Sequence, residues 1–387
     1  MLMKDILIAK FLSKFCSGNA PSVYFAPGRI NIIGEHIDYN GGLVLPANIN
    51  LGTYIAASFR ADTKIVFYSE NFNEEITIDF NDLSFKTEHA WANYPKGVMA
   101  MLKENGHKID KGLNIYIFGN LPHGTGLSSS ASVELATAVM LNHMFDFSMQ
   151  SIDLVKLAQK AENEYMKLKC GIMDQFIIGM GKKGNAILLN TSNLQFEHIP
   201  LDLGSYQFVI TNSMKERKLT ESKYNERLEE CRLGLKQIQK GLNVEHLCQL
   251  TELDFSKIDK LIADETIKRR VKHVVSENNR TIKAAELLKN GNIIELGELL
   301  NQSHMSLKNY YEVTGFELDT LQEIQVKQKG VLGSRMTGAG FGGCTITLIS
   351  TDYIDAFINN VKSEYKSKTN LNAEFYVVTS ANGASRV

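Results

Sequence analysis

Residues 124–130 constrain this chain more than any other stretch, because they read Gly-Thr-Gly-Leu-Ser-Ser-Ser. Glycines let a backbone approach a ligand closely, and hydroxyl groups can donate hydrogen bonds or coordinate magnesium. Residues 113–118 before this stretch are patterned as a strand, and residues 130–145 after it as a helix. The free N–H groups at the start of that helix point toward the loop. This order of strand, loop and helix predicts a site that holds an anion such as a phosphate.

An ordinary strand-to-helix turn capped by serine is the alternative for this stretch. One serine is enough for a cap, whereas three in a row after Gly-x-Gly are better explained by anion binding. The stretch is not a Walker P-loop, because it lacks the Gly-Lys-Ser/Thr ending.

The size and charge of the chain limit the classes of protein to which it can belong. Its 387 residues predict two or three domains. Basic residues number 42 and acidic residues 43, so neither nucleic acid nor an anionic membrane is expected as a partner. The five cysteines are scattered without a C-x-x-C pair, and neither a signal peptide nor a bilayer-length apolar run is evident. These features predict a cytoplasmic protein with reduced thiols.

The pattern of expected elements changes near the middle of the chain. Residues 22–80 contain short strand patterns separated by Gly, Pro, Asn and Asp. After about residue 216 the chain becomes charged, amphipathic and helical, before strand patterns return at 344–349 and 374–378. Because helices and strands mix without a strict βαβ rhythm, we predict an α+β fold. Two domains are expected, residues 1–205 and residues 206–387.

A polar segment at residues 28–42 carries the first candidate binding residues. Its side chains Arg29, Glu35, His36 and Asp38 lie close together in the sequence and are flanked by glycines. Carboxylates and imidazole bind hydroxyl groups in defined directions, which is how a sugar is held. The alternative is a polar connecting loop with glycine turns.

Asp174 is the candidate catalytic carboxylate, because it lies in an apolar run at residues 170–176. A carboxylate is costly there unless it is paired or reactive, so it is either half of a buried ion pair or a general base. Glu162 precedes it on a predicted helix over 151–166. A glutamate from that helix and a carboxylate in the following loop could serve one site, one holding a metal ion and the other facing the acceptor.

A glycine-rich segment near the C-terminal end has the spacing Gly338-x-Gly340-x-x-Gly343. This is the spacing of a dinucleotide-binding fingerprint, which follows a strand and opens a helix. Here a β-branched strand pattern follows the glycines instead, which excludes nicotinamide or flavin binding. We expect a tight loop that packs against another loop or lets a ligand approach the backbone.

Taken together, these segments resemble the galactokinase family, part of the superfamily named for galactokinase, homoserine kinase, mevalonate kinase and phosphomevalonate kinase. Residues 28–42 are similar to the family's signature, residues 122–134 to its phosphate loop, and residues 337–344 to its glycine-rich third motif. Residues 170–176 are similar to the segment that carries the catalytic aspartate. The resemblance implies a two-domain fold of mixed sheets and helices, with the active site in the cleft between the domains.

The resemblance also implies a role for each matching position. Asp174 matches the catalytic base, and Arg29 matches the arginine that faces it. Ser130 and Glu162 match magnesium ligands. The positions that match sugar contacts are Glu35, His36, Asp38 and Tyr224. The positions that match nucleotide contacts are Ser69, Gly124, Thr125, Gly126, Leu127, Ser128, Ser129 and Ser130.

The activity that the resemblance implies is Mg²⁺-assisted transfer of a phosphoryl group from ATP to the anomeric hydroxyl of α-D-galactose, the first step of galactose use. Galactose and ATP are therefore the expected partners, and no signal for an oligomeric state is present. Two alternatives stay open: a galactose- and ATP-binding regulator without catalysis, and a related kinase for N-acetylgalactosamine, arabinose or galacturonate. The intact Ser130-Ala131 step, together with Asp174 and Arg29, disfavours the regulator.

Overall fold

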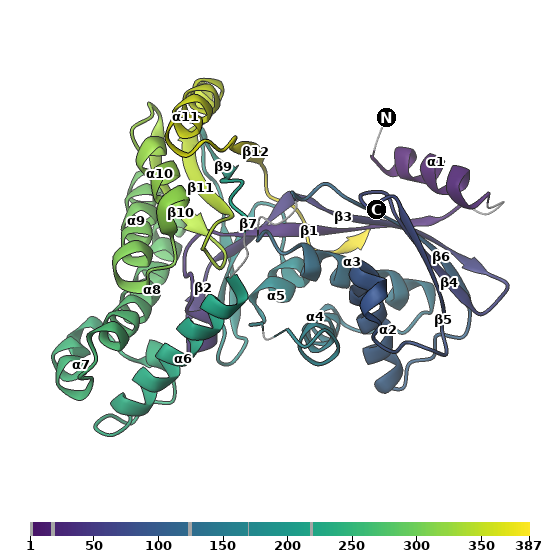
Figure 1. Cartoon of the computed structure of the whole chain (residues 1–387), viewed down its shortest axis with the longest axis horizontal. Helices are drawn as coiled ribbons and strands as arrows, with labels where there is room; N and C mark the ends of the chain where they lie inside the picture. Colours follow the sequence, from purple (N-terminus) through teal and green to yellow (C-terminus); the bar gives the residue numbers. More distant parts are fainter. Residues whose placement is uncertain (1–2, 17–19, 123–125, 169, 217–219) are drawn as a thin grey trace.

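The computed structural model describes residues 3–16, 20–122, 126–168, 170–216 and 220–387. The chain forms an α+β structure with two domains, each built around its own β-sheet (Figure 1). Within the ranges described, no helix combines the length and the hydropathy that crossing a bilayer requires.

The sheet of the N-terminal domain has six strands in the order β13-β1-β3-β6-β4-β5. The strands are β1 (Ser22–Asn31), β3 (Pro46–Arg60), β4 (Lys64–Ser69), β5 (Glu74–Asp79), β6 (Gly112–Gly119) and β13 (Ser385–Arg386). Neighbouring strands are antiparallel except β4 and β6, which run parallel. Because β13 pairs with β1, the C-terminal end of the chain returns to the first sheet.

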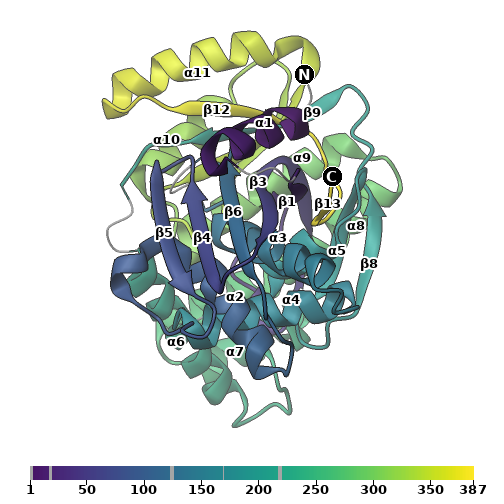
Figure 2. The ribbon, with the colours of Figure 1, turned by 90° about the vertical axis from the view of Figure 1, so that its right-hand side faces the viewer.

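Helices cover both faces of this sheet (Figures 1 and 2). On one face lie α2 (Asn93–Glu104), α3 (Ser129–Met144), α4 (Ser151–Lys160) and α5 (Met173–Met180). Successive residues of a strand point to opposite faces, so Ile55 of β3 packs with Leu135 of α3 while its neighbour Ala56 faces away. On that second face Ala56 meets Leu7 and Phe11 of α1 (Met3–Phe15).

The sheet of the C-terminal domain has four antiparallel strands in the order β10-β11-β9-β12. They are β9 (Tyr206–Asn212), β10 (Val331–Thr337), β11 (Cys344–Ser350) and β12 (Glu374–Val378). One face packs on α8 (Glu265–Lys289) and α9 (Ile293–Ser306), with Ile346 of β11 in the same core as Leu300. The other face packs on α10 (Gly315–Gln325) and α11 (Ile354–Thr369), where Val209 of β9 meets Phe357.

Three short strands and two further helices complete the fold. The strands β2 (Leu43–Val44), β7 (Asn185–Asn190) and β8 (Phe196–Pro200) form a third sheet. The helices are α6 (Thr220–Ile238) and α7 (Phe255–Leu261), and α6 packs against α8.

The strongly patterned elements agree with the sequence predictions. The strand predicted at 113–118 is confirmed as β6, and the helix predicted at 130–145 is confirmed as α3. The prediction that Asp174 lies in a loop is wrong, because Asp174 is in the first turn of α5. That helix has only 8 residues and none of them is exposed, so its sequence carries no clear polar face.

Candidate active site

Three glycine-containing segments from distant parts of the chain meet around Arg29 at the end of β1. The Arg29 backbone N–H donates to the carbonyl oxygen of Leu127 at 3.4 Å, and its Nη1 donates to the carbonyl oxygen of Gly126 at 2.6 Å. Gly338 has a left-handed backbone with φ of 87°, and a Cβ there would lie 3.3 Å from the Gly126 oxygen. The prediction that the glycine-rich segment packs against another loop is therefore confirmed.

Arg29 and Asp174 form a bidentate ion pair at the centre of this region. Arg29 Nε lies 2.9 Å from Asp174 Oδ1, and Nη2 lies 3.0 Å from Oδ2. The hydroxyl of Ser128 also donates to Asp174 Oδ2. The arginine side chain is 5% exposed and the aspartate side chain 30% exposed, so a buried cation holds a carboxylate that faces open space. The first turn of α5 adds a favourable helix-dipole contribution to that negative charge.

A cavity of about 180 Å³ opens beside this ion pair, and we call it the Asp174 cavity. Both domains contribute to its wall. Its lining residues are Arg29, Glu35, His36, Asp38, Cys170, Gly171, Met173, Asp174, Tyr224, Gly338 and Ala339. All six residues that the sequence predicted for catalysis and sugar contact thus line one cavity, which lies between the two domains.

Asp38 is the residue of the Asp174 cavity with the most strongly perturbed carboxylate. Burial raises its pKa to about 7, with further contributions from the negative charges of Asp174 and Glu35. The carboxylate fits because residue 171 is glycine: a Cβ on Gly171 would lie 2.2 Å from Asp38 Oδ2. A buried acid whose charged form is disfavoured is well suited to bind hydroxyl groups.

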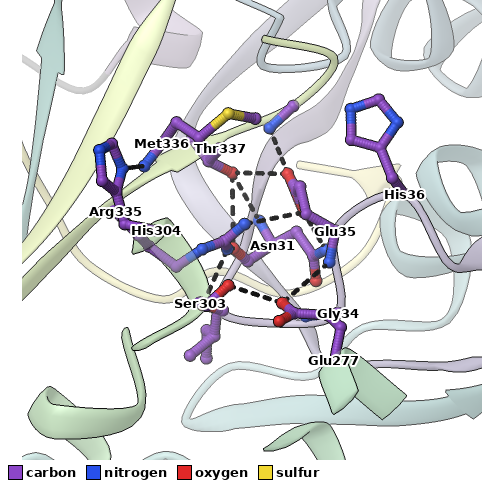
Figure 3. Close-up of polar contacts among 12 residues, drawn as sticks. Asn31, Gly34, Glu35, His36, Glu277, Ser303, His304, Arg335, Met336 and Thr337 are labelled. Carbon is purple, nitrogen blue, oxygen red and sulfur yellow. Dashed lines mark hydrogen bonds and ion pairs between the residues drawn. The ribbon is translucent and has the colours of Figure 1, made fainter. Parts of the chain in front are cut away.

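Glu35 and His36 line the same cavity while their polar atoms bind the protein itself. The Glu35 carboxylate accepts hydrogen bonds from Asn31 and from the Gly338 backbone, and lies 3.4 Å from Arg335 (Figure 3). His36 donates from Nε2 to the carbonyl oxygen of Ala339 at 3.1 Å, while Nδ1 accepts from a tyrosine hydroxyl. Burial, with a further contribution from the neighbouring His273, lowers the pKa of His36 to about 3, so its ring is neutral.

A second cavity of about 180 Å³ is lined by Ser129 and Ser130, which directly follow Ser128, and we call it the Ser130 cavity. Ser69 at the end of β4 and Ser129 and Ser130 at the start of α3 line it, as predicted for nucleotide contacts. Its other lining residues are Thr53, Asn71, Phe72, Trp91, Tyr94, Ile117, Gly119, Leu121 and Val133. The predicted residues Gly124 and Thr125 lie outside the part of the chain that the structure describes.

Aromatic residues of the Ser130 cavity were missed by sequence reasoning. Trp91 lies 6.2 Å from Phe72, ring centre to ring centre, with their planes 19° apart, and its indole N–H donates to Glu74 at 2.6 Å. Tyr94 lies in the first turn of the next helix, α2. The available signal was that Trp91 is the only tryptophan of the chain, in a short irregular stretch between patterned elements.

Buried carboxylates cluster next to Ser130. Glu162 lies in a π-helical turn at Ala161–Tyr165 and accepts hydrogen bonds from Ser130 and Gln175. Glu134, one turn into α3, is fully buried, and its Oε1 has no hydrogen-bond partner in the described structure. Burial raises the pKa of both glutamates, and the negative charge of Glu162 contributes further to the shift of Glu134. Such a cluster favours a nearby cation.

Three family models match the chain. They are the N-terminal domain of GHMP kinases over residues 93–182, the galactose-binding signature of galactokinase over 9–59, and the C-terminal domain of GHMP kinases over 284–367.

Curated relatives and solved structures agree with these models. A galactokinase from Clostridium acetobutylicum is 46% identical, with 95% of each chain covered, and one from Enterococcus faecalis is 47% identical over the full length of both chains. The structure of Lactococcus lactis galactokinase in complex with galactose superposes with a TM-score of 0.96, at 46% identity and 100% coverage of both chains. A mevalonate kinase with 20% identity has a TM-score of 0.67, covers 93% of this chain and 99% of its own, and shares the fold.

Proposed function

We infer the role of each site residue from the family to which the chain belongs. This chain belongs to the galactokinase family of the GHMP kinases. It uses ATP to phosphorylate α-D-galactose at the anomeric hydroxyl, giving galactose 1-phosphate and ADP. The observation that carries the residue assignments is the Arg29–Asp174 pair, which lines one cavity and binds Ser128, the residue next to Ser129 of the second cavity.

We assign the chemistry of the acceptor to Asp174 and Arg29. Asp174 orients the anomeric hydroxyl and accepts its proton, since its carboxylate lines the sugar-side cavity. Arg29 fixes that carboxylate through two hydrogen bonds and offsets the negative charge that develops in the transition state. Ser128 orients the same carboxylate from the opposite side.

We assign galactose to the Asp174 cavity. Asp38 and Tyr224 face the sugar from the two domains, and Glu35 and His36 form the floor that the third glycine motif holds in place. The cavity is polar and small, which suits a monosaccharide better than a larger acceptor.

We assign ATP to the Ser130 cavity and the loop beside it. The phosphates lie against residues 124–130 and the N-terminus of α3, where the first backbone N–H groups of a helix have no partner within the helix and, among the described residues, the Ser128 side chain does not cap them. Ser128 has a left-handed backbone with φ of 63°, which bends the chain tightly just before the helix. The purine ring lies near Trp91 and Ser69, where aromatic side chains line the cavity.

The residues beside the phosphates fit a magnesium ion. In the described part of the chain no three His, Cys, Asp or Glu side chains are arranged to hold a metal by themselves. Magnesium in kinases takes one or two carboxylates and completes its shell with phosphates and water. Glu162 and Ser130 are the ligands we propose, and the buried Oε1 of Glu134 beside them, which has no hydrogen-bond partner in the described structure, supports the assignment. When bound, magnesium neutralises phosphate charge.

A cytoplasmic location is part of the proposal. The chain has five free cysteines, a composition typical of a reducing compartment. ATP and a phosphorylated sugar product are also handled there.

Replacing Asp174 by asparagine tests the proposal directly. The amide keeps the size of the side chain but cannot take the proton, so kcat should fall by at least about 10²-fold while galactose still binds. ADP release is the measurement of activity, and calorimetric titration with galactose the measurement of binding. Asp153→Asn is the matched control, because Asp153 is also in the first turn of a helix and is exposed. Unchanged turnover in Asp174→Asn would remove the assignment, and a wild-type protein that binds galactose without releasing ADP would make it a regulator.

A further inference from the structure

Glu277 is a buried carboxylate that the mechanism above does not use. It lies in the middle of α8, in the C-terminal domain, and is 0% exposed. Burial raises the pKa of such a group, but the interactions with Arg280, His273 and Arg335 outweigh burial and lower it to about 2. Glu277 is therefore ionised, whereas burial raises the pKa of Asp38 in the Asp174 cavity.

The Glu277 carboxylate binds two successive backbone N–H groups of the N-terminal domain. Its Oε1 accepts from the N–H of Gly34 at 3.1 Å and from that of Glu35 at 3.4 Å (Figure 3). The same oxygen accepts from the hydroxyl of Ser303 on α9 at 2.6 Å, while Oε2 accepts from Arg280 Nε at 2.8 Å. Two consecutive N–H groups that converge on an anion form a concave, directional site.

His273 binds the other backbone polar group of Glu35, its carbonyl. It lies one helical turn before Glu277, so both side chains are on the same face of α8. Its Nε2 donates to the carbonyl oxygen of Glu35 at 3.2 Å, and its Nδ1 accepts from Ser306 at 2.8 Å. Burial lowers the pKa of His273 to about 4, which keeps the ring neutral and fixes these donor and acceptor roles. The N–H and the C=O of Glu35 are thus both bound by α8.

The backbone that α8 holds is strained and carries sugar-site residues. Gly34 has φ of 101° and His36 has φ of 63°, and the second value is uncommon for a residue with a side chain. A segment in this conformation keeps its shape only when neighbouring groups hold it. Because Glu35 and His36 line the Asp174 cavity, displacing their backbone displaces the floor of the sugar site.

We propose that Glu277 and His273 are positioning residues for galactose: they fix residues 34–36 from the second domain and so set the affinity for the sugar. The inference rests on the proposed function, because it takes the Asp174 cavity as the sugar site. Neither residue touches that cavity, so their effect on the reaction passes through the backbone of Glu35.

Glu277→Gln is the direct test. The amide keeps the shape and one acceptor oxygen but removes the charge, so the hold on the two N–H groups weakens. We expect the KM for galactose to rise about tenfold, the effect of weakening one charge-assisted hydrogen bond, with kcat and the KM for ATP within about twofold of wild type. Glu286→Gln is the matched control, since Glu286 lies on the same helix but is exposed.

Ser303→Ala keeps the test decisive if Glu277→Gln does not fold. It removes one hydrogen bond to Glu277 Oε1 without removing a charge, and we expect a rise of about threefold in the KM for galactose. The inference is overturned if the folded variants have a wild-type KM for galactose, or if the KM for ATP rises equally. Failure of the proposed function gives a different result, because wild-type protein would then release no ADP with galactose.

Discussion

Replacing Gly171 by alanine should impair sugar binding without weakening the fold. A Cβ at this position would lie 2.2 Å from Asp38 Oδ2 and 3.1 Å from its Cγ. Real Cβ atoms essentially never approach another heavy atom closer than 3.0 Å, so the carboxylate oxygen must retreat by about 0.8 Å. Gly171 does not use the left-handed backbone region, so alanine is allowed there.

The stability and the affinity should respond in opposite ways. The end of the Asp38 side chain can rotate, so its movement costs little, and exchanging glycine for alanine stabilises a fold by about 0.4–1 kcal/mol through the unfolded chain. The effect on the reaction is larger, because the Asp38 carboxylate that binds the sugar is displaced by nearly 1 Å. Misplacement of this size lowers the reaction rate by up to about 10²-fold. We expect the galactose kcat/KM to fall about 10–100-fold, with an unchanged KM for ATP and a melting temperature at or slightly above that of wild type.

A double-mutant cycle with Asp38→Ala identifies the cause. Steady-state ADP release is measured against galactose at saturating ATP, and against ATP at saturating galactose, for wild type, both single variants and the double variant. If Gly171→Ala acts by displacing the carboxylate, it should have almost no further effect once Asp38 is alanine. An equal loss in the Asp38→Ala background, or an equal rise in the KM for ATP, would refute the reasoning.

Two further predictions concern the pH dependence of stability and the nucleotide cavity. Burial, with contributions from Asp174 and Glu35, raises the pKa of Asp38 from 3.8 to about 7. The free energy of unfolding therefore decreases as the pH rises from about 4 to about 7, and the full loss is present above pH 7. Asp38→Asn should therefore raise the melting temperature of the ligand-free protein more at pH 8 than at pH 5, and an equal effect at both would contradict this. Trp91→Leu removes an aromatic face from the Ser130 cavity and should raise the KM for ATP by about 3–10-fold, with the KM for galactose as its internal control.

Local parts of the site followed from the sequence because short-range patterns specify them. The run at residues 124–130 predicts a turn followed by a helix, because glycines and serines influence the backbone conformation of only a few neighbouring residues. The start of α3 at Ser129 agrees with this prediction. The alternating strand before it is β6 for the same reason. The spacing of the four segments does not predict that Arg29 and Asp174 face each other. The resemblance of these segments to the family predicted that contact.

Long-range contacts could not be read from the pattern. Glu35 was predicted as a sugar contact, and the structure adds that its carboxylate binds the backbone of Gly338, more than 300 residues away. Glu277 and His273 looked like ordinary polar positions of an amphipathic helix, because their burial depends on how the second domain packs on the first. Asp174 was placed in a loop, since a short helix that is buried on nearly all sides has no polar stripe to detect.

The direction of the pKa shift separates two kinds of buried carboxylate in this molecule. Asp38, Glu134 and Glu162 have raised pKa values, burial being the largest cause. Asp38 lines the cavity proposed for the sugar, and Glu162 binds Ser130, which lines the cavity proposed for the nucleotide, while Glu134 is joined to Glu162 through Gln175. Glu277 is fully buried, yet its pKa is lowered, because cationic and hydrogen-bonding groups of the protein already satisfy it. Three acids whose negative charge the protein compensates poorly are available to bind ligands. An acid whose charge the protein compensates fully holds other residues in place. The same residue type therefore binds ligands in the first setting and positions the backbone in the second.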